Sequence, residues 1–89
     1  MTVYVDDMRV PFGRWLMCHM IADTAGELHE MAAAIGVGPR WFHRGDHYDI
    51  NWTQRAEAVK RGAIEAPRRF VARRVAVMRG KRNKARHTL

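Results

Sequence analysis

The stretch that most constrains the fold is residues 15–22, which is almost wholly apolar. In an extended chain successive side chains point to opposite faces, and both faces of this stretch would be apolar. Such a strand is typical of the centre of a sheet that is covered on both sides. A buried helix is the alternative, but the following Asp23-Thr24 pair favours a strand that ends at a helix cap. The alternation places Trp15, Met17, His19 and Ile21 on one face, and Leu16, Cys18, Met20 and Ala22 on the other.

A second, short strand is predicted at residues 3–5, because β-branched and aromatic residues favour extended backbone. This strand runs directly into two adjacent carboxylates, Asp6 and Asp7. Side chains at strand ends in α/β folds line the crevice where ligands and metals bind. On a regular strand the two carboxylates would point to opposite faces, so we expect one to be a ligand and the other to cap the next loop. Residues 8–13 contain Pro11 and Gly13 and predict that loop.

A helix over residues 24–35 has the clearest pattern. Thr24 and Glu27 have the spacing of a capping box at its start, and Gly36 supplies a left-handed stop at its end. One stripe of the helix is apolar and is expected to face the core. The stripe consists of Leu28, Met31, Ala32 and Ile35.

The remaining elements are shorter or less regular. Residues 41–43 and 47–50 predict two short strands around a turn, or one strand after a loop. Asn51 and Gln54 predict a capped second helix that ends at Gly62, followed by a short strand at residues 63–65. The predicted core face of the second helix contains Trp52, Ala56 and Val59, and that of a third helix from Pro67 to Arg79 contains Phe70, Val71, Val75, Val77 and Met78.

These elements predict an α/β fold, with α+β as the alternative: a three- to four-stranded sheet, two or three helices and a basic C-terminal extension. Residues 1–66 would form a compact domain, residues 67–79 a basic amphipathic helix packed on it, and residues 80–89 a disordered basic tail. An 89-residue chain buries a small core, so a homodimer would add stability. With one cysteine, no membrane-length apolar run and no signal peptide, we expect a cytoplasmic protein without membrane contact.

The charge is divided unevenly along the chain. Residues 1–50 carry seven acidic and four basic residues, a net charge of −3, whereas residues 51–89 carry twelve basic and two acidic residues, a net charge of +10. A basic half attracts polyanions, so we expect DNA or RNA as a partner through phosphate contacts. A solvated surface and a membrane-surface helix are the alternatives. The expected nucleic-acid-binding residues are Arg68, Arg69, Arg73, Arg74, Arg79, Lys81, Arg82, Lys84 and Arg86.

The front half contains a group of carboxylates and imidazoles that suits a divalent metal, Mg²⁺, Mn²⁺ or Zn²⁺. His47 and Asp49 are two residues apart and share a face on a strand. Asp7, His47 and Asp49 are the expected metal ligands. If the protein is an enzyme, the expected catalytic residues are Asp6, Asp7, His19, His47 and Asp49. The alternative reading is a core histidine at His19 that is satisfied by aspartates capping turns.

Other motifs have simpler explanations. The His43-x3-His47 spacing matches zinc proteases only on a helix, and Gly45 disfavours a helix there. Arg44-Gly45-Asp46 predicts a turn. Cys18 is expected in the core rather than as a nucleophile, and the three tryptophans are expected in the core rather than stacked on bases.

Several segments resemble one family: residues 4–8 (Tyr-Val-Asp-Asp-Met), 17–20 (Met-Cys-His-Met) leading to 22–24, 27–29 and 47–50 (His-Tyr-Asp-Ile). They are similar to small phage and actinobacterial proteins grouped as domain of unknown function 4031, over roughly residues 2 to 65. The resemblance implies an α/β fold and a bacterial or phage-infected cytoplasm, and it implies no activity.

We therefore expect a small phage-type protein that associates with nucleic acid through its arginine-rich C-terminal segment and has an acidic/histidine pocket for a divalent metal. The first alternative is a metal-dependent nuclease or phosphoesterase, in which the metal activates water while arginines hold the phosphate backbone. The second alternative is an interaction protein that binds a host protein through its aromatic surface.

Overall fold

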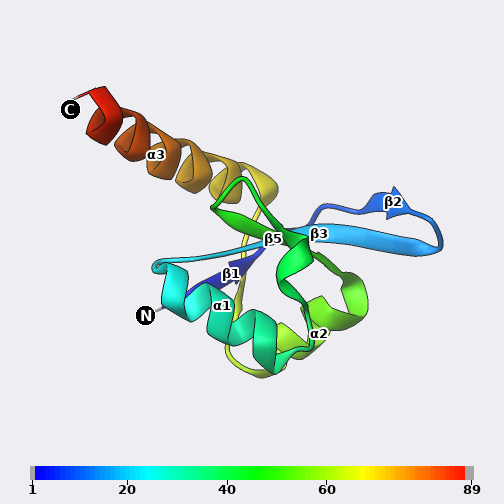
Figure 1. Ribbon diagram of the computed structural model, residues 1–89. Helices are drawn as coiled ribbons and strands as arrows, with labels where there is room; N and C mark the ends of the chain where they lie inside the picture. Colours follow the sequence, from blue (N-terminus) through cyan, green and yellow to red (C-terminus); the bar gives the residue numbers. More distant parts are fainter. Residues whose placement is uncertain (1, 88–89) are drawn as a thin grey trace.

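The computed structural model describes the backbone of residues 2–87 and the side chains of residues 2–81. Over these residues the fold is mixed α/β, as predicted, with three α-helices, one 3₁₀-helix and a six-stranded sheet instead of three or four strands (Figure 1). The additional strands are short and lie at the edges. The strands are β1 (Val3–Val5), β2 (Val10–Phe12), β3 (Trp15–Ala22), β4 (Phe42–His43), β5 (His47–Asn51) and β6 (Ile64–Glu65), and the helices are α1 (Ala25–Ala34), η1 (Pro39–Trp41), α2 (Trp52–Lys60) and α3 (Arg68–His87).

The apolar strand β3 is the centre of the sheet, as its two apolar faces predicted. The strand order is β4-β5-β3-β1-β6, and β2 pairs with the first residues of β3. All pairs are antiparallel except β1 with β6. Because β1 and β5 flank β3, the two acidic segments of the sequence lie on either side of the same central strand.

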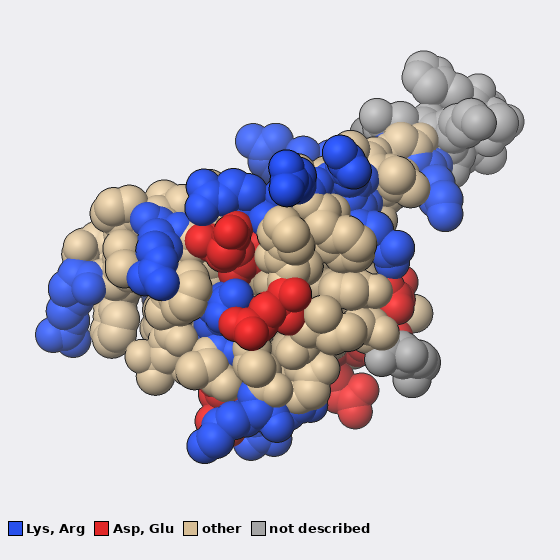
Figure 2. Space-filling view, turned by 180° about the vertical axis from the view of Figure 1, so that it is seen from behind, with Lys and Arg blue, Asp and Glu red and all other residues tan. Residues whose placement is uncertain are grey.

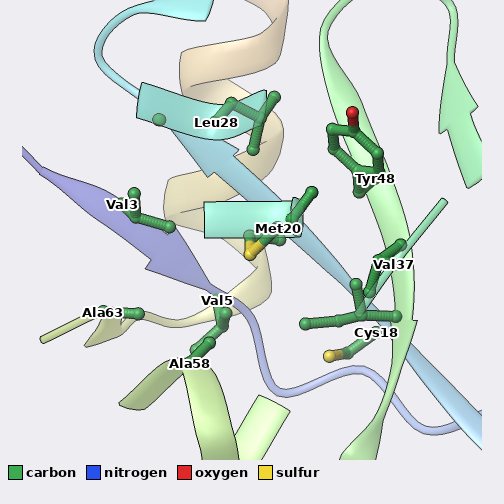
Figure 3. Packing of buried hydrophobic residues seen from close by; sticks show 12 residues of the cluster. Val3, Val5, Cys18, Met20, Leu28, Val37, Tyr48, Ala58 and Ala63 are labelled. Atoms are coloured by element: carbon green, nitrogen blue, oxygen red, sulfur yellow. The ribbon is translucent and has the colours of Figure 1, made fainter. Parts of the chain in front are cut away.

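One face of the sheet packs on α1 and α2 and forms the main core (Figures 1 and 3). Val5 and Met20 are fully buried there and Cys18 is 1% exposed. Leu28 of α1 and Ala58 of α2 close the layer. This is the face that alternation assigned to Cys18, Met20 and Ala22, so that prediction is confirmed.

The opposite face of the sheet is covered by α3 alone among the described helices (Figure 1). Val71 of α3 is buried, and the Phe70 ring lies 5.1 Å from the Tyr4 ring of β1. Val77, which was predicted to face the core, is 55% exposed. Because a single helix covers this face, whereas two helices cover the other, this face is less completely buried and can hold polar side chains.

Residues 10–12 form a strand, where a loop was predicted. Val10, Pro11 and Phe12 pair with Met17, Leu16 and Trp15 through a two-residue turn. Gly13 has φ 58°, a conformation that tight hairpin turns need and glycine adopts without strain. Pro11 is compatible with the strand because β2 lies at an edge, where one row of backbone groups needs no partner.

The predicted helix caps are confirmed. The Thr24 hydroxyl accepts a hydrogen bond from Glu27 N, and Asn51 and Gln54 make both bonds of a capping box. Gly36 and Gly62 have the positive φ angles expected at helix ends.

The predicted core face of α2 is wrong. Its buried residues are Arg55 and Ala58, whereas Trp52 and Val59 are half-buried and Ala56 is exposed. Apolar periodicity could not include Arg55, because an arginine is buried only where partners satisfy its guanidinium.

The helix α3 continues to His87, where a disordered tail was predicted from residue 80. The physical reason is that arginine, lysine and alanine are good helix formers even when no apolar stripe is present. The rest of the predicted tail, residues 88–89, lies outside the described residues. No helix within residues 2–87 is long and apolar enough to cross a membrane.

Candidate metal centre

Strand register places the predicted site residues on the face of the sheet that α3 covers. His19 of β3 pairs with Asp49 of β5, and Asp6, which follows β1, donates its backbone N–H to the His19 carbonyl at 3.0 Å. Directly opposite residues share a face, so Asp6, His19 and Asp49 form a row across three strands. His47, two residues before Asp49, lies on the same face.

Asp6 is a buried carboxylate that fixes the orientation of His19. It is 2% exposed, and its Oδ1 accepts hydrogen bonds from His19 N at 2.9 Å and Met8 N at 3.2 Å. Its Oδ2 lies 2.8 Å from His19 Nδ1. A carboxylate only accepts hydrogen bonds, so Nδ1 donates and the Nε2 lone pair of neutral His19 is left for another partner.

The same contact changes the proton affinity of His19. The hydrogen bond to Asp6 raises the pKa of His19 above its usual 6.5, against the opposing effect of burial, and the charges of Asp6 and Asp49 add to the increase. A ligand of His19 Nε2 must therefore compete with a proton that is held more tightly than on a free imidazole.

His47 is oriented in the same way by Asp46. The two side chains are joined by a 2.6 Å contact between His47 Nδ1 and Asp46 Oδ1, and Arg79 of α3 donates to Asp46 Oδ2 at 2.8 Å. Burial alone would raise the pKa of Asp46, but the hydrogen bonds from Arg79 and His47 outweigh it and lower the pKa below 3.8. Asp46 is therefore ionised at neutral pH and holds His47 with its Nε2 directed away from the carboxylate.

Both Nε2 atoms approach Asp49. Oδ1 of Asp49 lies 3.4 Å from His47 Nε2 and 3.8 Å from His19 Nε2. This oxygen is buried and has no hydrogen-bond partner among the described residues. A buried carboxylate oxygen without a partner is costly, and a water or a cation between these groups would satisfy it.

His43 extends the group on the other side of Asp49. It faces His47 across the β4–β5 pair, and its Nε2 lies 3.3 Å from Asp49 Oδ2. Its side chain is 43% exposed, the most open of the three histidines. No described residue binds its Nδ1.

His19, His47 and Asp49 can together hold a metal ion, because one ligand atom from each lies within 4.8 Å of the others. Two imidazoles and one carboxylate are a common ligand set for zinc and other transition metals. In such sites the second imidazole nitrogen usually donates to a carboxylate, which is the role of Asp6 for His19 and of Asp46 for His47.

Asp7 was predicted as a metal ligand, and the structure places it elsewhere. Its side chain is 54% exposed and accepts hydrogen bonds from Arg68 N and Nε, each at 3.1 Å. The hydrogen bond from the Arg68 side chain lowers the pKa of Asp7. Asp7 thus holds the start of α3, and Asp6 is the carboxylate of the pair that belongs to the site.

Sequence reasoning missed four residues around this site. Three of them lie beside His47 and Asp49. His43 was considered only for its spacing to His47, Asp46 only as part of a turn, and Arg79 only as a contact to phosphate. The fourth is Arg55, which is 6% exposed, donates to the Asp6 carbonyl at 2.8 Å and pairs with Glu65. No pattern in the sequence marks Arg55 for burial, because the Asp6 carbonyl and Glu65 meet it only in the folded chain.

Two cavities reach the site. One, of about 420 Å³, lies between the sheet and α3, and His19 and His47 line it with Val75 and Arg79. The other, of about 440 Å³, lies beside β2 and η1 and reaches His19, His43 and Asp49. His19 lines both, so the candidate metal centre borders both cavities.

Cys18 is not available for chemistry. It is buried in the main core, and burial raises the pKa of its thiol to about 12. The thiol is protonated at neutral pH, as expected of a core cysteine.

The described basic residues of α3 form a cationic ridge, visible along the helix in Figure 2: Arg68, Arg69, Arg73, Arg74, Arg79 and Lys81. Three of them also make ion pairs within the molecule: Arg68 with Asp7, Arg74 with Asp23 and Arg79 with Asp46. The exposed Arg69, Arg73 and Lys81 have no described acidic partner. The side chains of Arg82, Lys84 and Arg86 lie outside the described ones.

Comparison with known proteins identifies a family for this chain but no individual relative. No curated protein and no solved structure shows significant similarity to the chain. A family model matches residues 3–78, and thus extends beyond residue 65, where the noted resemblance ended, to include α3 as far as Met78. The chain belongs to this family, DUF4031, whose description is "protein of unknown function".

Proposed function

We propose that the protein binds one divalent transition-metal ion between Nε2 of His19, Nε2 of His47 and the carboxylate of Asp49. The observation that carries this proposal is the buried, unpartnered Oδ1 of Asp49, which both Nε2 atoms face. Of the three ions expected, Zn²⁺ suits two imidazoles best, because Mg²⁺ and Mn²⁺ prefer oxygen ligands.

The reaction class that this site supports best is metal-assisted hydrolysis of a phosphate ester. Three protein ligands leave positions for water and for a phosphoryl oxygen, and the ion would lower the pKa of that water. Water would add to phosphorus as the bond from phosphorus to the leaving oxygen breaks. His43 is the available proton acceptor, since its Nδ1 has no described partner and its Nε2 lies beside Asp49.

The test is calorimetric titration of the metal-free chain with Zn²⁺ and Mn²⁺, together with the visible absorption of bound Co²⁺. Wild type should bind one equivalent, and Asp49→Asn and His47→Gln should weaken binding at least tenfold. His29→Gln is the matched control, because His29 lies on α1 and bonds Tyr48 on the other face. Unchanged binding in Asp49→Asn would remove the proposed site.

Hydrolysis is measured separately on bis(4-nitrophenyl) phosphate with the metal-loaded chain. We expect His43→Gln to lower turnover by about 10²-fold or more while leaving the metal stoichiometry intact. Equal turnover in wild type and Asp49→Asn would contradict a metal-dependent reaction.

A second function, association with DNA or RNA, rests on the cationic ridge of α3. Arg69, Arg73 and Lys81 are exposed and without described acidic partners, which leaves them free for phosphates. If about five phosphates are contacted, log K against log[salt] should slope by about −4 to −5. Arg69→Gln with Arg73→Gln should reduce that slope by about 2. A slope near zero would contradict the proposal.

A further inference from the structure

The cavity beside β2 and η1 is lined by the large aromatic side chains of Phe12 and Trp41, whereas no Phe, Tyr or Trp is among the described residues that line the cavity beneath α3. Its walls include Val10, Phe12 and Trp41, the exposed Arg40 lies at its mouth, and His19, His43 and Asp49 of the candidate metal centre also line it. At about 440 Å³ it is within the size range of sites that bind small organic ligands.

One wall of this cavity is an aromatic surface that the chain leaves uncovered. Phe12 is 56% exposed on the β2–β3 hairpin, which extends away from the body of the sheet (Figure 1). Its ring packs edge-on to Trp41, with 5.6 Å between ring centres, and this contact holds the hairpin against η1. The exposed Phe12 ring, braced by the half-buried Trp41 ring, provides a surface on which another ring can stack.

A cation without a carboxylate partner lies at the mouth. The Arg40 guanidinium stacks 5.2 Å from the centre of the Trp41 ring, and no described carboxylate pairs with it. Among the described residues, Asp49 is the only acidic one that lines the cavity, and its carboxylate lies beside His19, His43 and His47. An anionic group that enters would lie between Arg40 and the metal centre.

We propose that this cavity binds a nucleotide, with its base against Phe12 and Trp41 and its phosphate between Arg40 and the metal ion. This inference rests on the proposed metal site and names the substrate class for it. The phosphate-bearing nucleotide is either a free mononucleotide or the phosphorylated end of a single strand, since both present the same base and phosphate.

The test is calorimetric titration of the zinc-loaded full chain with adenosine 5′-monophosphate and with adenosine. The mononucleotide should bind at least tenfold more tightly than the nucleoside, because adenosine lacks the phosphate that Arg40 and zinc would hold. Phe12→Ala should weaken binding about 5- to 100-fold through lost stacking, and Arg40→Gln about tenfold or more. Both side chains are on the surface, so the substitutions leave the core intact.

Arg14→Gln is the matched control, because Arg14 is on the same hairpin but stacks on Trp15 outside the cavity. An equal loss in Arg14→Gln and Arg40→Gln would overturn the proposal in favour of diffuse attraction to a basic surface. Equal affinity for nucleotide and nucleoside would also overturn it. Tighter binding of a 5′-phosphorylated oligonucleotide than of the mononucleotide supports the strand-end source, and equal affinity of the two supports a mononucleotide site.

Zinc titration of the same samples separates the two proposals. A chain that binds zinc at Asp49 but not the mononucleotide overturns the nucleotide site and leaves the proposed metal centre standing. A chain that does not bind zinc overturns the metal centre itself.

Discussion

At the scale of single residues, the site depends on which nitrogen of each imidazole is occupied. Asp6 and Asp46 each bind an Nδ1 atom from a buried position, and each is held in turn by other groups: backbone N–H groups for Asp6 and Arg79 for Asp46. The two carboxylates therefore direct both Nε2 atoms toward the same oxygen of Asp49. That oxygen has no hydrogen-bond partner among the described residues, and a bound cation would compensate its charge.

The raised pKa of His19 predicts opposite pH dependences for stability and for metal binding. A group whose pKa is higher in the folded state stabilises the fold below its unfolded pKa of about 6.5, and that contribution is lost as pH rises through the folded pKa. The metal-free chain should therefore lose stability above pH 6.5, while zinc affinity rises over the same interval because the Nε2 proton must leave.

Asp6→Asn tests this assignment, because the amide keeps an acceptor oxygen for the backbone and removes the charge that raises the pKa. Urea unfolding in chelator at pH 6 and pH 8 should show a smaller stability difference in Asp6→Asn than in wild type. The same pH dependence in both proteins would mean that the hydrogen bond to Asp6 is not its cause.

At the scale of elements, the two faces of the sheet have different roles: one forms the apolar core and the other bears the polar site. α1 and α2 supply the apolar packing, whereas α3 adds Val71 and Phe70 and otherwise contributes charge. α3 is also tied to the site itself, because Arg79 holds Asp46 and Arg68 holds Asp7. The family match includes α3 as far as Met78.

The packing of α1 is tested by Leu28→Ala. Leu28 is 3% exposed in the main core, so removing its side chain should leave a cavity and cost about 2–4 kcal/mol of unfolding free energy. Glu30→Ala on the exposed side of the same helix should change it by less than about 0.5 kcal/mol. Urea denaturation measures both, and equal midpoints for Leu28→Ala and Glu30→Ala would mean that α1 does not pack as described.

At the scale of the whole molecule, the sequence predicted what depends on local pattern. Alternation identified the central strand and its two faces, and capping residues located the helices. The sequence also predicted one site for His19, His47 and Asp49 with Asp6 or Asp7, and the structure brings Asp6 to it.

What the sequence could not supply is contact between distant segments. The choice between Asp6 and Asp7 depends on β1 ending one residue before Asp6, with its register against β3. The burial of Asp46 depends on Arg79, thirty-three positions away, and that of Arg55 on the Asp6 carbonyl. Polar residues are buried only when such partners arrive in three dimensions, and neither periodicity nor composition records the partner.

The last prediction couples the site to the fold. The three proposed ligands come from β3 and β5 and lie together only in the folded chain, so a metal that binds them must stabilise the folded state. At a free Zn²⁺ concentration of about 100 times Kd, the gain is about 2.7 kcal/mol. For a chain of this size that should raise Tm by roughly 10–20 °C.

Thermal unfolding followed by circular dichroism, with and without zinc, measures the shift. Asp49→Asn should abolish it, whereas Asp7→Asn should retain it, because Asp7 pairs with Arg68 on the surface and not with the histidines. A shift that is lost in Asp7→Asn and kept in Asp49→Asn would assign the metal to the other carboxylate and contradict the site as the structure places it.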